Sequence, residues 1–128
     1  MIGIDIVKIK RIENAIKKEN FYNFILTDIE IEYAKKKSVE KTRFGFSPRA
    51  MTVAGLFAGK EAILKALGVG MNNGVGFKDV VIDHDDKGAP VVVLTEKVRR
   101  ILEEKNKKKI YVSIAHDGDY ATAIAKVE

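Results

Sequence analysis

The spacing of apolar residues along the chain switches between the period of a strand and the period of a helix. At the N-terminus Ile2, Ile4 and Ile6 alternate with other residues, which predicts a strand with one buried aliphatic face. Asp5 lies on the opposite side of that strand. The alternation therefore predicts isoleucines in the core and an acidic side chain on the other face.

A short amphipathic helix over 8–18 is predicted directly after this strand. Ile9, Ile12 and Ile16 recur there at helical spacing among Lys and Glu residues. With the isoleucines facing inward, Arg11 projects from the polar face of the helix. Its charge is thus displayed to solvent.

A long helix over 48–67 has clear start and stop signals. Ser47 followed by Pro48 is typical of an N-cap and first helical position, and Gly68 suits the position just past the last turn. Four residues share the side of this helix that should face the core: Leu56, Gly59, Ile63 and Leu67.

The other elements are predicted by caps and turns, such as the capping-box pair Thr27 and Glu30. They are a helix over 28–36, a loop over 38–46, a glycine-rich loop over 70–76, strands over 77–83 and 90–94, a helix over 96–105, and a terminal hairpin of strands over 110–116 and 120–127. Helices and strands do not alternate regularly, so the pattern favours an α+β fold in which an antiparallel sheet packs on the long helix. The length of 128 residues indicates a single domain.

Three charged residues interrupt the otherwise apolar second half of the long helix: Lys60, Glu61 and Lys65. A helix that is apolar nearly all round is normally buried, and a buried charge needs a partner. Glu61 and Lys65 are four residues apart and project from one face. They form either a simple ion pair within the helix or part of a ligand site, and the apolar surroundings favour the site.

Composition narrows the possible functions. The chain has no Cys, which excludes disulfides and thiolate metal sites and suits a reducing cytoplasm. No apolar run is long enough to span a membrane. A formal net charge of +5 indicates an acidic partner, which could be a nucleic acid, an anionic lipid, a phosphorylated small molecule or an acidic protein. The basic runs lack the interleaved aromatic residues of a single-stranded nucleic-acid groove.

Three segments together resemble one known family. They are Gly3 to Val7 with Arg11 and Ile12, Phe57 to Gly68, and Val112 to His116 with Tyr120 and Ala121. In this order and at this length they closely resemble the holo-acyl-carrier-protein synthases, the small class of 4'-phosphopantetheinyl transferases. The resemblance covers nearly the whole chain and implies the fold of that family over residues 1–128.

The resemblance implies transfer of 4'-phosphopantetheine from coenzyme A to a serine of acyl carrier protein, with Mg²⁺ required and adenosine 3',5'-bisphosphate released. Asp5 and Glu61 match the family's metal ligands. Glu61 also matches a catalytic residue, whose implied role is either to orient or to deprotonate the serine, and Lys65 matches the lysine beside the pyrophosphate. His116 corresponds to a histidine that many members have next to the coenzyme.

One position departs from the family. The residue before Phe57 is commonly an arginine that reaches a coenzyme phosphate, and here it is Leu56. Arg49 at the start of the long helix is our candidate for that coenzyme contact, with Arg43 and Lys41 in the preceding loop as further sources of charge. Recognition of the 3'-phosphate is the step that this departure affects.

The resemblance also implies a homotrimer with active sites between neighbouring subunits. Arg11, Lys10 and Lys17 lie where the family docks the acidic recognition helix of the carrier protein, which would explain the net positive charge. Two alternatives remain for this chain: a basic module that binds nucleic acid or an anionic membrane, and a metal-dependent phosphoesterase that uses water as nucleophile.

Overall fold

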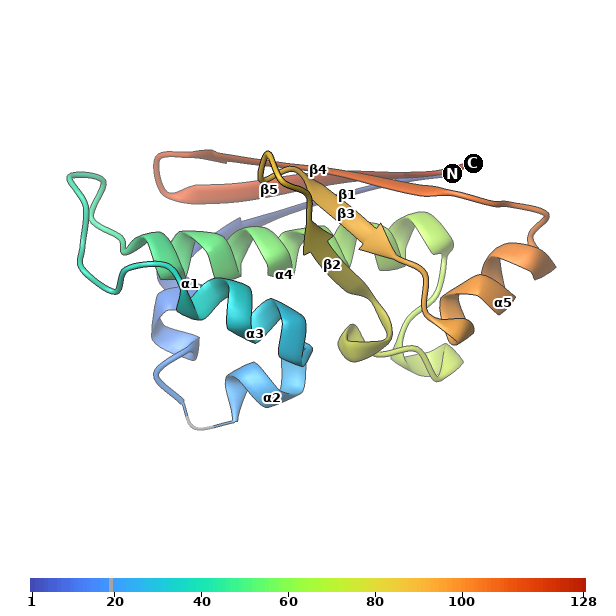
Figure 1. The fold of residues 1–128 in the computed structure, drawn as a ribbon, viewed down its shortest axis with the longest axis horizontal. Coiled ribbons are helices and arrows are strands. Elements are labelled where there is room, and N and C mark those ends of the chain that lie inside the picture. The colour runs from blue at the N-terminus through green and yellow to red at the C-terminus, as the bar shows by residue number, and fades with distance from the viewer. Residues whose placement is uncertain (19) are drawn as a thin grey trace.

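The computed structural model describes residues 1–18 and 20–128. In it, a layer of antiparallel strands lies along one long helix, and shorter helices and a second hairpin cover the rest of that helix (Figure 1). In chain order the elements are β1 (Ile2–Lys8), α1 (Ile9–Ala15), α2 (Phe21–Ile25), α3 (Asp28–Lys35), α4 (Pro48–Leu67), the 3-10 turns η1 (Met71–Asn73) and η2 (Phe77–Asp79), β2 (Val81–His84), β3 (Pro90–Val93), α5 (Glu96–Glu104), β4 (Ile110–Asp117) and β5 (Tyr120–Val127). The predicted α+β class is confirmed.

The long helix α4 has the predicted limits. The Ser47 hydroxyl accepts a hydrogen bond from the Ala50 backbone N–H at 3.1 Å, and Gly68 adopts the left-handed conformation that ends the helix, with a φ of 69°. The four residues predicted to face the core, which are Leu56, Gly59, Ile63 and Leu67, are all buried. Because α4 is buried along most of its length, it is the scaffold on which the other elements are placed.

Two antiparallel sheets pack against α4. The larger has the strand order β1-β5-β4, and the smaller is the β2–β3 hairpin. The hairpin of β4 and β5 turns at Gly118, as predicted, and β1 adds to the far edge of β5. This arrangement lays the first strand of the chain beside α4, although 39 residues lie between them in sequence.

The predicted inward face of β1 is wrong. Ile2, Ile4 and Ile6 are about two-thirds exposed, at 67%, 62% and 64%, whereas Gly3 and Asp5 turn toward α4. The reason is the close approach at Gly3, where a Cβ atom would stand 2.0 Å from the Ala62 carbonyl oxygen on α4. Alternation shows that two faces of a strand differ, but it does not show which face the rest of the chain covers.

The segment predicted as a strand over 77–83 begins instead with a 3-10 turn. In η2 the Asp79 carboxylate accepts a hydrogen bond from the Gly76 N–H at 2.8 Å, which favours a turn over an extended chain. The Thr95 hydroxyl donates to the Asp79 carbonyl at 3.0 Å and holds this turn against the start of α5. The strand β2 therefore begins only at Val81.

Candidate functional site

A strand residue and a helix residue form the centre of the candidate site. The Lys65 ammonium on α4 lies 3.1 Å from the Asp5 carboxylate and donates to the Ile4 carbonyl, also at 3.1 Å. This contact depends on the close packing of β1 on α4, which the predicted site required. Lys65 remains half exposed, with 54% of its side chain accessible, so its charge faces solvent as well as Asp5.

Glu61, one helical turn before Lys65, belongs to the same cluster. Partial burial raises the pKa of Glu61 and the negative charge of Asp5 raises it further, while Lys65 and Arg11 oppose the rise. A carboxylate whose ionised form is disfavoured by a neighbouring carboxylate is stabilised when a cation binds between the two.

The donor set suits a hard divalent cation. Mg²⁺ binds oxygen ligands, typically uses one or two carboxylates, and keeps several waters or takes substrate phosphates as its other ligands. Asp5 and Glu61 are such a pair. Within residues 1–18 and 20–128, no group of three or more His, Cys, Asp and Glu side chains gathers in metal-binding geometry.

A cavity of about 330 Å³ opens beside this cluster. Glu61 and Lys65 form one wall, Gly70 and Met71 of the glycine-rich loop form another, and Phe77 of η2 closes a third side. The glycine-rich loop therefore lies beside the charged face of α4. A reacting group in this cavity would meet the Glu61 carboxylate and the Lys65 ammonium, which is paired with Asp5.

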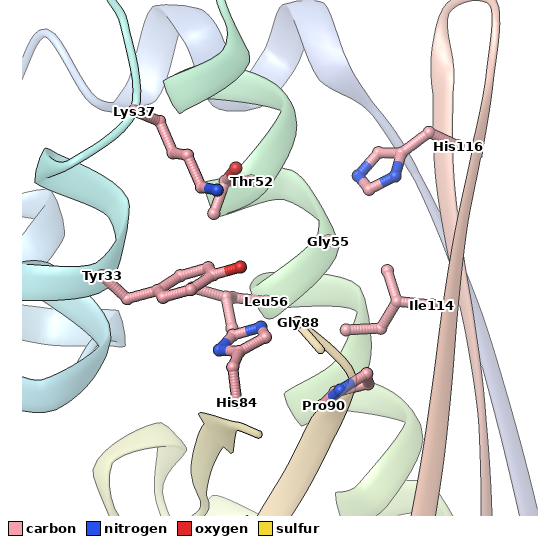
Figure 2. Close-up of a pocket in the computed structure, with 10 residues that line it drawn as sticks. All are labelled: Tyr33, Lys37, Thr52, Gly55, Leu56, His84, Gly88, Pro90, Ile114 and His116. Atoms are coloured by element: carbon pink, nitrogen blue, oxygen red, sulfur yellow. The ribbon is translucent and has the colours of Figure 1, made fainter. Parts of the chain in front are cut away.

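His116 lies in a second cavity of about 200 Å³, shown in Figure 2. Its Nε2 atom is 2.8 Å from the Met51 carbonyl oxygen, near the start of α4. The ring also packs against Gly55, which precedes Lys65 by ten residues, or about 15 Å at the rise of a helix. Within one chain, His116 and Lys65 therefore line separate cavities.

The second cavity also has a flat aromatic wall and a lysine. The rings of Tyr33 and His84 stack with centroids 3.6 Å apart and an interplanar angle of 5°, and Lys37 Nζ lies 4.9 Å from the centre of the Tyr33 ring. Burial lowers the pKa of His84, which favours its neutral form. Leu56 lines the same cavity, so Lys37 supplies a cation close to the position that the family commonly gives to arginine.

Arg49 contacts the backbone at the end of α3. Its Nε atom donates to the Lys37 carbonyl at 3.2 Å, and its Nη2 atom donates to the Lys35 carbonyl at 2.9 Å. The guanidinium group thus holds the segment that follows α3. Arg43 lies over the ring of Phe44 at 5.0 Å. Neither arginine is among the residues that line the two cavities described above.

Arg11 is closer to the site than its sequence position suggested. It is exposed on α1, and its guanidinium group lies 5.8 Å from the centre of the Phe57 ring on α4. Lys10 and Lys17 are also exposed, and Lys10 pairs with Glu13 at 3.3 Å. Lys10 and Arg11 on α1 and Lys17 just after it are thus exposed cations, and Arg11 is close enough to Glu61 to act on its pKa.

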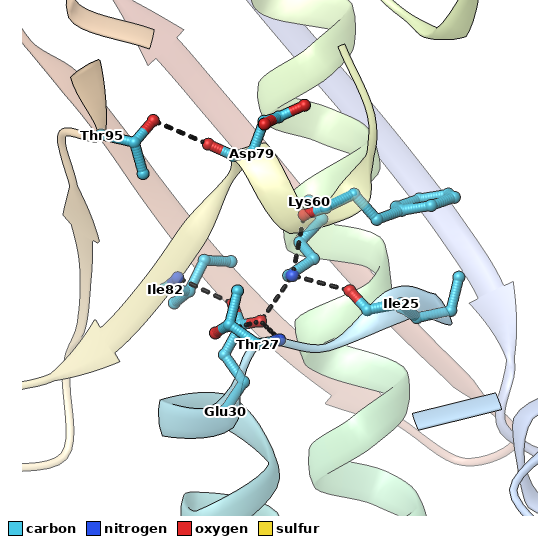
Figure 3. Close-up of polar contacts among 8 residues, drawn as sticks. Ile25, Thr27, Glu30, Lys60, Asp79, Ile82 and Thr95 are labelled. Carbon is cyan, nitrogen blue, oxygen red and sulfur yellow. Dashed lines mark hydrogen bonds and ion pairs between the residues drawn. The ribbon is translucent and has the colours of Figure 1, made fainter. Parts of the chain in front are cut away.

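The sequence analysis missed an ion pair between Glu30 on α3 and Lys60 on α4, shown in Figure 3. Both side chains are completely buried. Lys60 was noted as a charge in an apolar helix, but Glu30 was assigned only to the capping box. Burial lowers the pKa of Lys60, and the adjacent Glu30 carboxylate opposes that shift.

The chain is similar in sequence to the proteins of one known superfamily. A model of the 4'-phosphopantetheinyl transferase superfamily matches residues 1–125, and the chain belongs to that superfamily. It is 43% identical to the holo-acyl-carrier-protein synthase of Fusobacterium nucleatum over 125 residues, which cover 97% of this chain and 94% of that protein. It is 41% identical to the enzyme of the same name from Clostridium kluyveri over 128 residues, with 99% and 88% covered.

Solved structures agree with the sequence comparison. The holo-acyl-carrier-protein synthase of Helicobacter pylori in complex with coenzyme A superimposes with a TM-score of 0.81 at 35% identity and covers 100% of both chains. The synthase of Neisseria meningitidis gives a TM-score of 0.84 at 29% identity, with 99% of this chain and 96% of that chain covered. The resemblance found in the sequence is therefore confirmed, and so is the predicted fold.

Proposed function

We propose that this chain transfers the 4'-phosphopantetheine group of coenzyme A to a serine of apo-acyl carrier protein. The observation that carries the proposal is the cluster of Asp5, Glu61 and Lys65 beside an open cavity, in a chain that is 43% identical to a holo-acyl-carrier-protein synthase over 97% of its length. The serine oxygen forms a bond to the phosphorus nearer pantetheine, and the bond from that phosphorus to the bridging oxygen breaks. Adenosine 3',5'-bisphosphate leaves.

Asp5 and Glu61 would hold the Mg²⁺ ion. When bound, the ion would neutralise charge on the pyrophosphate oxygens. The mutual repulsion of the two carboxylates, which contributes to the raised pKa of Glu61, supports this assignment. Lys65 keeps a positive charge at the edge of the same cavity, where it would stabilise the departing phosphate. Glu61 would also orient the attacking serine or accept its proton.

Coenzyme A is the substrate in this scheme, and the Helicobacter pylori relative, 35% identical to this chain, was solved in complex with coenzyme A. We assign the pantetheine end to the cavity of Glu61 and Lys65, and the nucleotide end to a cavity like that of His116. The stacked rings of Tyr33 and His84 suit a purine, and Lys37 suits a phosphate. Arg49, which already donates to two backbone carbonyls, is the weaker candidate for that phosphate.

A homotrimer would bring the two kinds of cavity from neighbouring subunits together. The outer face of the larger sheet supports self-association because it carries exposed apolar side chains from all three strands: Ile2, Ile4, Ile6, Tyr111 and Ile124. We expect the wild-type chain to sediment as a trimer, and Ile4→Lys to shift it toward monomer with loss of transfer. A wild-type chain that stays monomeric at micromolar concentration would contradict this assembly.

The decisive experiment is the intact mass of an apo-acyl carrier protein after incubation with coenzyme A, Mg²⁺ and this chain. We expect the carrier to gain the mass of one phosphopantetheine and adenosine 3',5'-bisphosphate to appear in equal amount. Chelation of the metal or Glu61→Gln should prevent both. Phosphopantetheine released free into solution would indicate hydrolysis instead, and salt-sensitive binding of an RNA probe that persists in Glu61→Gln would indicate a nucleic-acid module.

An acidic carrier protein as substrate would also account for the net positive charge of the chain. Arg11 and Lys10 on α1 and Lys17 just after it are exposed cations, and we assign the docking of the acidic carrier to them. The chain has no helix, among the residues that the structure describes, that is long and apolar enough to cross a membrane.

A further inference from the structure

The ion pair between Glu30 and Lys60 connects parts of the chain that are far apart in sequence. Lys60 Nζ contacts the Glu30 carboxylate and donates to the Ile25 carbonyl at 2.7 Å and to the Phe77 carbonyl at 2.9 Å. An ammonium group has three donors, so these three partners use all of them. Lys60 therefore has no donor left for a substrate.

The carboxylate is equally occupied. Glu30 Oε1 accepts from the Thr27 N–H at 2.8 Å and from the Thr27 hydroxyl at 3.0 Å, and Oε2 accepts from the Ile82 N–H at 2.8 Å. Together the two side chains tie the end of α2, the start of α3, the turn η2 and the strand β2 to the middle of α4 (Figure 3). A buried ion pair adds little net stability compared with apolar residues of the same volume, so stability alone does not account for this arrangement.

Phe77 connects the pair to the site. Its carbonyl oxygen accepts from Lys60, while its side chain lines the cavity of Glu61 and Lys65. Its ring also lies 5.5 Å from the Phe57 ring, at an interplanar angle of 28°. The hydrogen bond from Lys60 thus fixes the distance between this wall of the cavity and α4, the helix that carries Glu61.

We propose that Glu30 and Lys60 are positioning residues, which fix η2 as a wall of the cavity beside Glu61 and act on phosphopantetheine transfer through that wall. This inference rests on the proposed function, since the cavity is assigned there to the pantetheine end of coenzyme A. Neither side chain reaches that cavity, because both are completely buried.

The test must separate positioning from stability. Lys60→Met leaves the Glu30 charge buried without a cation and is expected to lower the thermal midpoint strongly. The double variant Glu30→Gln with Lys60→Met removes both charges, so we expect its thermal midpoint to recover most of that loss. Its transfer rate should stay below that of the wild type by about 10-fold or more, because small displacements of a site wall are costly.

Hydrogen exchange provides a readout that does not depend on activity. In the double variant we expect the amides of residues 74–80 to exchange at least about 10-fold faster, since the turn loses its anchor, while strands β4 and β5 keep their protection. The matched control is Leu102→Ala, which removes a buried side chain of α5 that lines neither cavity. It should lower the thermal midpoint while leaving transfer by the folded protein and the exchange of residues 74–80 unchanged.

Each outcome separates the hypotheses. A double variant that matches the wild type in both exchange and transfer overturns the positioning role, and so does one with faster exchange but full transfer. Faster exchange together with slower transfer in a protein of recovered stability supports it. If the wild type transfers nothing to any apo carrier protein, the proposed function fails, which is a different result from a variant that equals an active wild type.

Discussion

The helix α4 carries two lysines that pair with carboxylates from other elements, and the two pairs differ in nearly every respect. Lys60 and Glu30 are completely buried, and the described hydrogen bonds use all three ammonium donors and both carboxylate oxygens. Lys65 and Asp5, by contrast, leave 54% and 16% of their side chains exposed, and Lys65 borders an open cavity. The first pair has no ammonium donor left for a ligand, while the second pair can still bind one.

The comparison shows why charge in an apolar helix is an ambiguous signal. In both pairs the sequence offers a lysine on α4 and an acidic residue from an earlier element, separated by 30 and 60 residues. The two pairs differ in their surroundings. Backbone carbonyl groups surround the Lys60 ammonium, whereas the cluster of Asp5, Glu61 and Lys65 stays accessible from the cavity that Glu61 and Lys65 line. Function is therefore expected at Lys65, and support of the site at Lys60.

The largest effect should come from the carboxylates of the accessible cluster. Asp5→Asn and Glu61→Gln should each lower transfer by about 100-fold or more, because each removes an interaction that stabilises the transition state. Neither side chain is fully buried, so the thermal midpoint should stay near that of the wild type. Initial rates at limiting Mg²⁺, measured with circular dichroism melts of the same samples, check both expectations.

Asp86→Asn is a matched control for these two variants, since it removes a carboxylate from the exposed turn before β3. It should leave both the rate and the thermal midpoint unchanged. Full activity of either Asp5→Asn or Glu61→Gln would remove the basis for the metal assignment.

A smaller effect on rate is expected at the lysine of this cluster. Lys65→Ala should lower kcat by about 10-fold to 100-fold while the KM for coenzyme A changes little, because the charge is most useful when the leaving phosphate develops. Steady-state kinetics with coenzyme A varied at saturating carrier protein separate the two constants. A rise in KM at unchanged kcat would mean that Lys65 contributes only to binding.

The sequence predicted local features of this molecule better than long-range ones. The limits of α4 and its cap at Ser47 were correct, because a helix end depends on a few neighbouring residues. The covered face of β1 was wrong, and η2 was taken for a strand, because both depend on segments far away in the chain.

The candidate site shows the same limit. The family resemblance implied that Asp5 lies near Glu61 on the long helix, and spacing alone indicated only that Glu61 and Lys65 share a helix face; the ion pair of Asp5 with Lys65 was not predicted. The partner of Lys60 was not found, because the capping box already gave Glu30 a local role. When one residue takes part in both a helix cap and a buried ion pair, a single sequence shows only the cap.

The packing of β1 on α4 is the basis of the accessible cluster, and Gly3 is its most sensitive point. A Cβ atom at this position would stand 2.0 Å from the Ala62 carbonyl oxygen and 2.6 Å from the Ala66 nitrogen, both backbone atoms of α4. Gly3→Ala should therefore destabilise the fold by about 1–3 kcal/mol and shift Asp5 away from Lys65. Chemical denaturation measures the first effect and the transfer rate the second. Gly70→Ala, where a Cβ meets open space, is the control for stability.

The smallest effect is expected at the exposed cations on and just after α1, which we assign to encounter with the carrier. Arg11→Glu should raise the KM for acyl carrier protein roughly 10-fold, because it replaces an attraction of up to about 1 kcal/mol by a repulsion. Lys17→Glu should act in the same direction and less strongly, and added salt should weaken the wild-type enzyme likewise. Lys108→Glu, before β4, should change nothing.

The Arg11→Glu variant also tests how far the accessible cluster extends. Its guanidinium group lies over Phe57 and its charge opposes the raised pKa of Glu61, so α1 borders the accessible cluster. If Arg11 belongs to the carrier surface, the KM for coenzyme A should hardly change in Arg11→Glu. A loss of coenzyme affinity with unchanged carrier kinetics would instead place Arg11 in the nucleotide site, and the accessible cluster would then extend from β1 and α4 onto α1.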